Sequence, residues 1–382
     1  MPETPEQERK EGVGLALSGG GFRATLFHIG SLWRLNELGW LKKLSEVTSV
    51  SGGSITAAYL GYRWKDLTFD TEGVAQDFKD KVVLPLREFC SHTADVGSII
   101  GGIIGPFVHP SQLLARKYRK RLFGDATLQD LPSDEEGPRF TIYATSLQTG
   151  VSVRFSRPYM ADYLVGMIDS PDVSLAQAVA ASSAFPPVFC PVSLKRDVES
   201  WRKVGGADLH GNAKLRSKML LVDGGVYDNL ALERVWDDYT TVLVSDAGAP
   251  FDVMERSWKV RMSQIFRTIR VLGIIAEQTR RLRRRVLMDF YTSGAMAGAY
   301  WNIGSKTGNY KLEQAGLPGP IVEDCEGTTE MSEIRTRLNS FSAEEQEQLI
   351  NWGYALNDTA MRRWVLGLSI QPGTLPYPDR AF

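Results

Sequence analysis

Three short stretches of the chain combine glycines with a hydroxyl or a carboxylate, residue types that together can carry acyl-transfer chemistry. They are SGGGFR at residues 18–23, SVSGG at residues 49–53 and DGG at residues 223–225. A serine can attack a carbonyl carbon, a carboxylate can take the serine proton, and glycine N–H groups can bind the resulting oxyanion. We therefore predict that the three stretches meet at one site.

Ser51 is the candidate nucleophile. It lies between a short predicted strand at residues 47–50 and a helix that we expect to begin near Ile55. A nucleophile elbow needs small neighbours, usually as Gly-x-Ser-x-Gly, and here Ser49 replaces the first glycine. The positive end of the helix dipole would also favour negative charge on Ser51 during attack. The alternative interpretation is that Ser51 only caps the helix.

Gly20 and Gly21 are the candidate oxyanion donors. They lie between a predicted strand at residues 13–17 and a predicted helix at residues 24–38. Backbone N–H groups at such a turn can bind an anion. The GxGxxG order and the Gly-Lys-Ser/Thr of a P-loop are both absent, so the nucleotide signal is weak. A tight turn without a ligand is the alternative.

Asp223 is the candidate general base. It follows an apolar strand-like run at residues 219–222, so we expect its carboxylate at the carboxyl end of a strand, where ligands of open α/β sheets gather. An Asp-Gly turn is the alternative. None of the four histidines follows a predicted strand as an α/β-hydrolase histidine does. We expect structural or surface roles for all four (His28, His92, His109 and His210).

The order of predicted elements is strand, glycine loop, helix, strand, tight turn and helix, which is typical of an α/β fold with a largely parallel sheet. Beyond residue 250 the pattern becomes helical: Ile269, Leu272 and Ile275 have helical spacing, and Ser342 and Glu345 form a capping box. Further strands are predicted at residues 140–144, 151–155, 219–222 and 241–244, and a helix at residues 174–182.

We divide the chain into a catalytic core, residues 12–250, and a helical C-terminal extension, residues 251–382, packed on the core in the same domain. The alternative is a separate helical domain that begins near residue 250. No internal repeat or low-complexity segment interrupts either part.

The composition is that of a soluble globular protein. Of 382 residues, 43% are hydrophobic and 23% are charged, and the net charge of −1 gives no reason to expect a nucleic acid polymer as partner. The cysteines Cys90, Cys190 and Cys325 lie far apart without metal-ligand spacing, so we expect no metal and no cofactor. The first dozen residues are polar, and no run of about 18 apolar residues occurs. We expect a cytoplasmic protein.

The chain resembles the patatin-like phospholipases and the related cytosolic phospholipases. The resemblance rests on GGGFR at residues 19–23, SVSGG at residues 49–53 and DGG at residues 223–225. The stretch AASSAFPPVF at residues 180–189 and the residues after Asp223, in DGGVYDNLALE, are also similar to the family. In all, it extends over about residues 12–248. Ser49 in place of glycine is the one departure.

The resemblance implies a three-layer α/β/α fold with a central, mostly parallel sheet and a helical C-terminal part. It implies a lipid acyl hydrolase of the phospholipase A or lysophospholipase type that acts on membrane lipids. It also implies a Ser-Asp dyad of Ser51 and Asp223 instead of a triad. The implied oxyanion hole consists of Gly20, Gly21, Arg23 and Gly52. Phospholipids, lysophospholipids, galactolipids and neutral glycerides all remain open as substrates.

Three further segments suggest a membrane surface or a regulator. An apolar stretch at residues 96–108 is either a flap that touches lipid or a buried segment. Basic clusters at residues 116–121 and 280–285 suit the headgroups of anionic lipids at the inner membrane face. They also suit a small phosphorylated activator, such as the cyclic nucleotides that switch on some patatin-like enzymes of bacterial defence systems. A solvated helix face that pairs with acidic neighbours is the alternative.

Two other functions compete with the hydrolase. One is a nucleotide- or phosphate-binding regulatory module in which the glycine loop at residues 19–21 holds an anion. The other is a catalytically silent scaffold at the membrane. The intact set of Ser51, Asp223 and the glycines favours the hydrolase.

Overall fold

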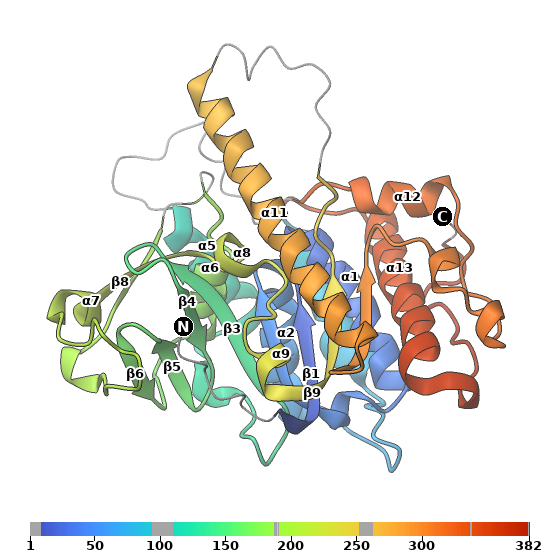
Figure 1. Cartoon of the computed structure of the whole chain (residues 1–382), viewed down its shortest axis with the longest axis horizontal. Helices are drawn as coiled ribbons and strands as arrows, with labels where there is room; N and C mark the ends of the chain where they lie inside the picture. The colour runs from blue at the N-terminus through green and yellow to red at the C-terminus, as the bar shows by residue number, and fades with distance from the viewer. Residues whose placement is uncertain are drawn as a thin grey trace.

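The computed structural model describes residues 9–93, 110–186, 189, 191–251, 263–336, 338–380 and 382. The apolar stretch at residues 96–108 therefore lies outside the described residues, as does the segment 252–262 that the sequence predicted to be helical. Figure 1 shows the arrangement of the described elements, with a sheet in the middle and helices on both of its faces.

Ten strands of the described chain form one mixed sheet, in the order β10-β9-β1-β2-β3-β4-β5-β6, with β8 paired to β3 and β7 to β8. Five neighbouring strands are parallel: β10 (Ala297–Asn302), β9 (Tyr239–Asp246), β1 (Lys10–Leu17), β2 (Leu44–Val50) and β3 (Arg139–Ser146). The remaining strands pair antiparallel: β4 (Ser152–Phe155), β5 (Tyr159–Asp162), β6 (Gly166–Asp169), β7 (Val192–Lys195) and β8 (Lys218–Asp223).

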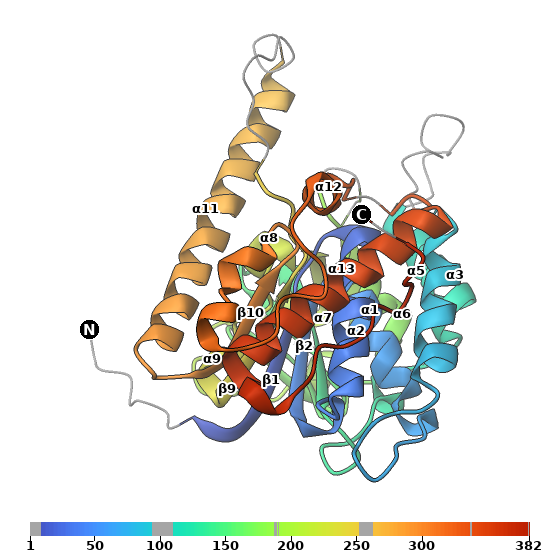
Figure 2. The same ribbon diagram turned by 90° about the vertical axis from the view of Figure 1, so that its right-hand side faces the viewer.

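Helices cover both faces of this sheet, which gives three layers (Figures 1 and 2). The larger apolar core joins the sheet to helices on one face: α1 (Gly21–Glu37), α2 (Gly52–Arg63), α3 (Leu84–Cys90), α5 (Pro110–Tyr118), α6 (Leu175–Ser182) and α13 (Ala343–Met361). The smaller core packs α9 (Val235–Asp238) and the second half of α11 (Gln264–Thr292) on the other face. Short helices α7 (Ala213–Ser217), α8 (Gly225–Asp228) and α12 (Glu326–Glu333) lie in the connections.

The structure confirms the predicted α/β class, the predicted strands and the helices that follow the two glycine-containing turns. It also confirms the capping box: the Ser342 hydroxyl accepts the Glu345 N–H at 3.2 Å, and the Glu345 carboxylate accepts the Ser342 N–H at 2.8 Å. Two features differ from the expectation. The C-terminal part contributes a strand, β10, to the sheet. In α11, Ile269, Leu272 and Ile275 are exposed although their spacing suggested a packed face.

The close crossing of α1 and α13 joins the C-terminal part to the helix that follows the glycine loop. A Cβ atom on Gly30 would lie 1.9 Å from the carbonyl oxygen of Ile350, and one on Gly353 would lie 1.9 Å from that of Phe27. Arg34 and Asp358 form an ion pair across the same crossing at 2.7 Å, with both side chains buried. Only glycine permits this distance, so the crossing depends on both glycines.

We predict that Gly30→Ala destabilises the protein by about 3 kcal/mol, because the added methyl group must push two helix backbones apart. Denaturant unfolding followed by circular dichroism measures the change. Gly273→Ala in α11 is the matched control, since a Cβ atom there meets nothing within 4 Å. The control should not destabilise the protein and is expected to stabilise it by up to about 1 kcal/mol, because alanine favours a helix more than glycine does. Equal losses in the two variants would contradict the role given to the crossing.

Candidate active site

Ser51 occupies a strained turn between β2 and α2. Its φ of 51° and ψ of −121° lie in a region that serine rarely adopts. It precedes the first residue of α2, and its carbonyl oxygen accepts the N–H groups of Ser54 and Ile55 at 2.9 and 3.2 Å. Its hydroxyl makes no capping hydrogen bond to the helix. A strained turn from a strand into a helix is the geometry that the sequence-based prediction of a nucleophile elbow requires.

The elbow packs directly on the glycine loop. A Cβ atom on Gly52 would lie 2.0 Å from the carbonyl oxygen of Gly21, so no larger residue fits after Ser51. A Cβ atom on Gly19 would lie 3.2 Å from the Ser51 Cβ atom. The structure therefore brings together the first two stretches that the sequence singled out.

Two helices begin at this contact. Gly20 and Gly21 have φ of 145° and 61°, and α1 begins at Gly21, while α2 begins at Gly52. The first N–H groups of a helix have no partner within the helix, and its N-terminus attracts negative charge. The backbone N–H groups of Gly20, Gly21 and Gly52 are thus available donors in the immediate surroundings of Ser51.

Asp223 is the last residue of β8, and its carboxyl group lies near enough to the Ser51 side chain for that side chain to lower its pKa. Its Oδ1 also accepts the Gly225 N–H at 2.7 Å. Burial raises the pKa of Asp223 from 3.8 to about 7, and the hydrogen bonds from Gly225 and Ser51 oppose this rise. A carboxyl group with such a pKa can both take and return a proton near neutral pH.

Asp223 reaches Ser51 on an antiparallel strand. The sequence suggested that Asp223 lies at the carboxyl end of a strand in a largely parallel sheet, without giving the direction of that strand. In the structure, β8 runs antiparallel to β3 and places Asp223 opposite Ala144, near the carboxyl end of β3. The position is as expected, and the structure adds the direction of the strand. The Asp223 N–H donates to the Ala184 carbonyl oxygen at 3.1 Å, which fixes this strand end.

Ser182, which the sequence did not single out, holds the elbow from the other side. Its hydroxyl accepts the Ser51 N–H at 2.9 Å and lies 2.9 Å from the Ser54 hydroxyl. The Ser54 hydroxyl donates to that of Ser49 at 3.0 Å. Ser49, the departure from the family pattern, thus belongs to a buried chain of hydroxyls behind the nucleophile. The small residues at the end of α6 were the available signal.

Asn229 is a second residue that the sequence did not single out. Its Oδ1 lies close to both glycine-containing segments. A Cβ atom added to Gly19 would lie 2.4 Å from this oxygen, and one added to Gly225 would lie 2.6 Å from it. Its carbonyl oxygen accepts the Gly19 N–H at 3.1 Å. Asn229 therefore links the glycine loop to the segment that carries Asp223.

The Arg23 side chain contacts the segment after β9 and the C-terminal part of the chain. Its guanidinium donates to the carbonyl oxygens of Ala247 at 2.7 Å and Ile334 at 2.8 Å. The side chain is buried, and this burial lowers its pKa to about 10. A Cβ atom on Gly20 would lie 3.5 Å from Arg23 Nη2 and 3.0 Å from the Ala247 carbonyl oxygen. Arg23 thus connects the loop to the end of β9 and to the C-terminal part.

The described histidines have partners other than the dyad. His28 is buried in α1, with Nδ1 2.8 Å from the Ser245 hydroxyl and Nε2 2.9 Å from the Ser18 carbonyl oxygen. Burial lowers its pKa to about 4, so it is neutral at neutral pH. His92 contacts the Glu88 carbonyl oxygen and His210 that of Val165. None of these hydrogen bonds involves Ser51 or Asp223, and His109 lies outside the described residues.

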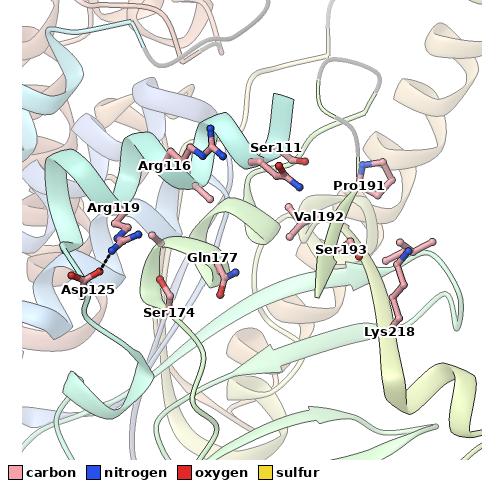
Figure 3. Close-up of a pocket in the computed structure, with 14 residues that line it drawn as sticks. Ser111, Arg116, Arg119, Asp125, Ser174, Gln177, Pro191, Val192, Ser193 and Lys218 are labelled. Atoms are coloured by element: carbon pink, nitrogen blue, oxygen red, sulfur yellow. Dashed lines mark ion pairs between the residues drawn. The ribbon is translucent and has the colours of Figure 1, made fainter. Parts of the chain in front are cut away.

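The first basic cluster, residues 116–121, borders a cavity of about 860 Å³ between α5, α6, β7 and β8 (Figure 3). Arg116, Arg119 and Lys218 line it, and Arg119 forms an ion pair with Asp125 at the same cavity. Tyr118 of the same cluster is buried. Neither Ser51 nor Asp223 lines the cavity, but its wall includes α6, the helix that ends at Ser182.

Two arginines of the second basic cluster, residues 280–285, form ion pairs with acidic residues of the core. Arg280 pairs with Asp246 at 2.8 Å, and Arg283 pairs with Glu233 at 3.2 Å and with Asp228 at 3.5 Å. Asp246 is the last residue of β9, and Asp228 and Glu233 follow β8, so the two arginines attach α11 beside the candidate site. The pairing agrees with the alternative interpretation of this cluster.

The fold and the grouped serine, aspartate and glycines agree with one class of hydrolase. Comparison with known families identifies that class. The chain belongs to the patatin-like phospholipase family, whose model matches residues 15–236, more than half of the 382 residues. A search of curated proteins gave no match. Among the described residues, no helix is long and apolar enough to cross a membrane.

Several solved structures are similar to this chain. Human GIVD cytosolic phospholipase A2 is 12% identical, with a TM-score of 0.49 over 92% of this chain and 61% of its own. VipD from Legionella pneumophila is 16% identical, with a TM-score of 0.37 over 92% and 66%. The type III effector ExoU of Pseudomonas aeruginosa is 13% identical, with a TM-score of 0.33 over 93% and 54%. The chain spans less than two thirds of each of these proteins.

We predict that Ser182→Ala lowers kcat at least about tenfold with little change in KM, because the Ser51 N–H loses its partner and the elbow loses its fixed position. Steady-state hydrolysis of a soluble short-chain ester measures both constants. Ser156→Ala, which removes a hydroxyl that donates to the Tyr159 carbonyl oxygen in the β4–β5 turn, is the control. An unchanged kcat in a folded Ser182→Ala protein would contradict this role.

Proposed function

We propose that this chain hydrolyses fatty-acyl esters of membrane lipids, as a phospholipase A or lysophospholipase, through a dyad of Ser51 and Asp223. The observation that carries the proposal is the position of the strained Ser51 beside a buried Asp223 with a pKa of about 7. Membership in the patatin-like phospholipase family supports lipid as the substrate class.

The first half of the reaction follows from this geometry. The Asp223 carboxylate takes the Ser51 proton while the Ser51 oxygen attacks the ester carbonyl carbon. The tetrahedral oxyanion accepts hydrogen bonds from the backbone N–H groups of Gly20, Gly21 and Gly52. When the intermediate collapses, Asp223 returns the proton to the departing alcohol, and the fatty acyl group stays on Ser51 as an ester.

Water completes the cycle. The oxygen of a water molecule attacks the acyl carbon while the Asp223 carboxylate takes a proton from that water. The second oxyanion accepts hydrogen bonds from the same backbone N–H groups as the first. Collapse returns the proton to Ser51 and releases the fatty acid. Arg23 serves this reaction indirectly, because its hydrogen bonds to Ala247 and Ile334 hold the glycine loop in position.

A nucleotide- or phosphate-binding role for the glycine loop is less favoured by these contacts. The loop packs on the elbow, where Gly21 meets Gly52, and Asn229 occupies the space beside Gly19. Its donors are therefore directed to the surroundings of Ser51. A phosphate would compete with an ester for the same place.

Location and partners belong to the same proposal. We place the protein in the cytoplasm, in peripheral contact with the inner face of the membrane that supplies its substrate. A small phosphorylated activator, such as a cyclic nucleotide, would find Arg116, Arg119 and Lys218 around one cavity beside α6. Because α6 ends at Ser182, a ligand there could change the position of Ser51.

We expect the wild-type protein to release free fatty acid and the matching lysolipid from mixed liposomes, and Ser51→Ala to release less than about 0.1% as much. Mass spectrometry of the lipids after incubation measures both products and names the lipid class. Ser54→Ala, one turn into α2 in the hydroxyl chain, is the control and should retain measurable activity. Equal release by wild type and Ser51→Ala would remove Ser51 from the mechanism.

A further inference from the structure

The first half of α11 exposes an unusual number of large apolar side chains. Six of them within residues 264–276 are between 40% and 58% exposed: Phe266, Ile269, Val271, Leu272, Ile274 and Ile275. In the second half of the same helix, by contrast, Leu287 is fully buried against the sheet. Contiguous apolar surface of this kind marks a site of interaction.

The apolar side chains surround the helix and do not form one stripe. At about 100° per residue, the six positions spread over the full circumference of the helix. A helix that is apolar all round is normally enclosed by its surroundings. The described part of the chain does not enclose this segment, so we look for a partner that can surround a helix.

The apolar segment projects beyond the edge of the sheet that carries Ser51. Near the end of α11, Tyr291 donates to the Val242 carbonyl oxygen in the middle of β9 at 2.7 Å. Eleven residues earlier, Arg280 reaches Asp246 at the carboxyl end of β9. The helix therefore runs toward that edge as its numbering decreases, and Gln264 lies about 24 Å beyond Arg280. Figures 1 and 2 both show α11 rising above the body of the molecule.

The same edge carries the candidate nucleophile. In the parallel part of the sheet, Ser245 of β9 is level with Leu17 of β1, and Leu17 is level with Ser49 of β2. Ser51 follows Ser49 by two residues. The apolar segment of α11 and Ser51 therefore face the same direction.

The charges on this segment have one sign. Between residues 263 and 276 the only charged residues are Arg267 and Arg270, and the first acidic residue is Glu277. Arg270 lies over the ring of Phe251, 4.1 Å from its centroid. Arginines among apolar side chains suit the headgroup layer of an anionic bilayer, where each positive charge contributes about 1 kcal/mol. A second copy of the chain would instead bring like charges together.

We propose that residues 264–276 of α11 enter the interfacial layer of an anionic lipid bilayer and thereby hold the Ser51 edge of the protein against it. The proposal concerns membrane binding and requires no catalysis by Ser51 and Asp223. It rests on the proposed function only in taking the bound lipid surface as the source of substrate.

The test is co-sedimentation with vesicles of phosphatidylcholine containing about 30% phosphatidylglycerol, with full-length Ser51→Ala protein so that the lipids stay intact. Leu272→Ser with Ile275→Ser should lower the partition coefficient at least tenfold. Trp364→Ser with Leu368→Ser removes two other side chains that are 55% and 72% exposed, and should leave binding unchanged. Arg267→Gln should weaken binding to these vesicles but not to pure phosphatidylcholine.

Three results would overturn the proposal: no binding by the parent protein, equal binding by the α11 variant, or loss of binding in both double variants. Sedimentation velocity without lipid tests whether a second copy of the chain, instead of a bilayer, binds this segment. If the α11 substitutions convert a dimer to a monomer while vesicle binding persists, the segment binds a second copy. Hydrolysis of a soluble ester, measured with Ser51 intact, should be unchanged by the α11 substitutions. If the protein with Ser51 intact hydrolyses no ester, while the parent binds vesicles and the α11 variant does not, the proposed dyad fails and this inference stands.

Discussion

The structure depends on one close contact, that of the glycine loop with the turn that carries Ser51. The carbonyl oxygen of Gly21 lies where any side chain on the residue after Ser51 would have to go. This contact sets the start of α1 beside the start of α2, so two helix N-termini direct their free N–H groups to one place. It also accounts for the strain at Ser51, since the chain must turn within one residue from β2 into α2. The surrounding elements act on this contact: Arg23 holds the loop, Ser182 holds the elbow, and α13 crosses α1 closely enough to fix its position.

The second constraint is the burial of Asp223. A carboxylate without a cationic partner is costly in a protein interior, and here burial raises its pKa to about 7. The carboxyl group keeps one hydrogen bond, from the Gly225 N–H, and the nearby Ser51 side chain opposes the rise in its pKa. Because its pKa is raised, the folded state favours the protonated form of Asp223. This residue therefore contributes stability that is fully present below pH 3.8 and is lost as the pH rises through about 7. Elsewhere the same edge keeps its charges paired, as Arg280 with Asp246 and Arg283 with Glu233.

Much of the fold and of the candidate site could be predicted from the sequence. The features that could not be predicted have physical causes. Glycines beside a serine or an aspartate indicate positions where the backbone turns tightly. The turns around Gly20 and Ser51 and the strand end at Asp223 could therefore be predicted. Ser182 could not, because its hydrogen bond to Ser51 joins residues 131 positions apart. The strand β10 escaped because AGAYWN is short and owes its conformation to pairing with β9. The antiparallel direction of β8 is likewise a property of pairing and not of local sequence. Helical spacing predicted α11 correctly but could not tell that its first half lies outside the core.

The most direct test of the central claim is the pH dependence of covalent labelling of Ser51 by a fluorophosphonate, followed by intact-mass measurement of wild type and Asp223→Asn. Labelling consumes the Ser51 hydroxyl and releases fluoride, so it reports the activated nucleophile without the need for a lipid or a membrane. The account predicts one adduct on Ser51, with a rate that rises about tenfold per pH unit below pH 7 and levels above it, because Asp223 must be ionised to take the proton. It predicts that Asp223→Asn reacts at least about 100-fold more slowly, without this dependence. Labelling of the two proteins at equal rates, or at a residue other than Ser51, would contradict it.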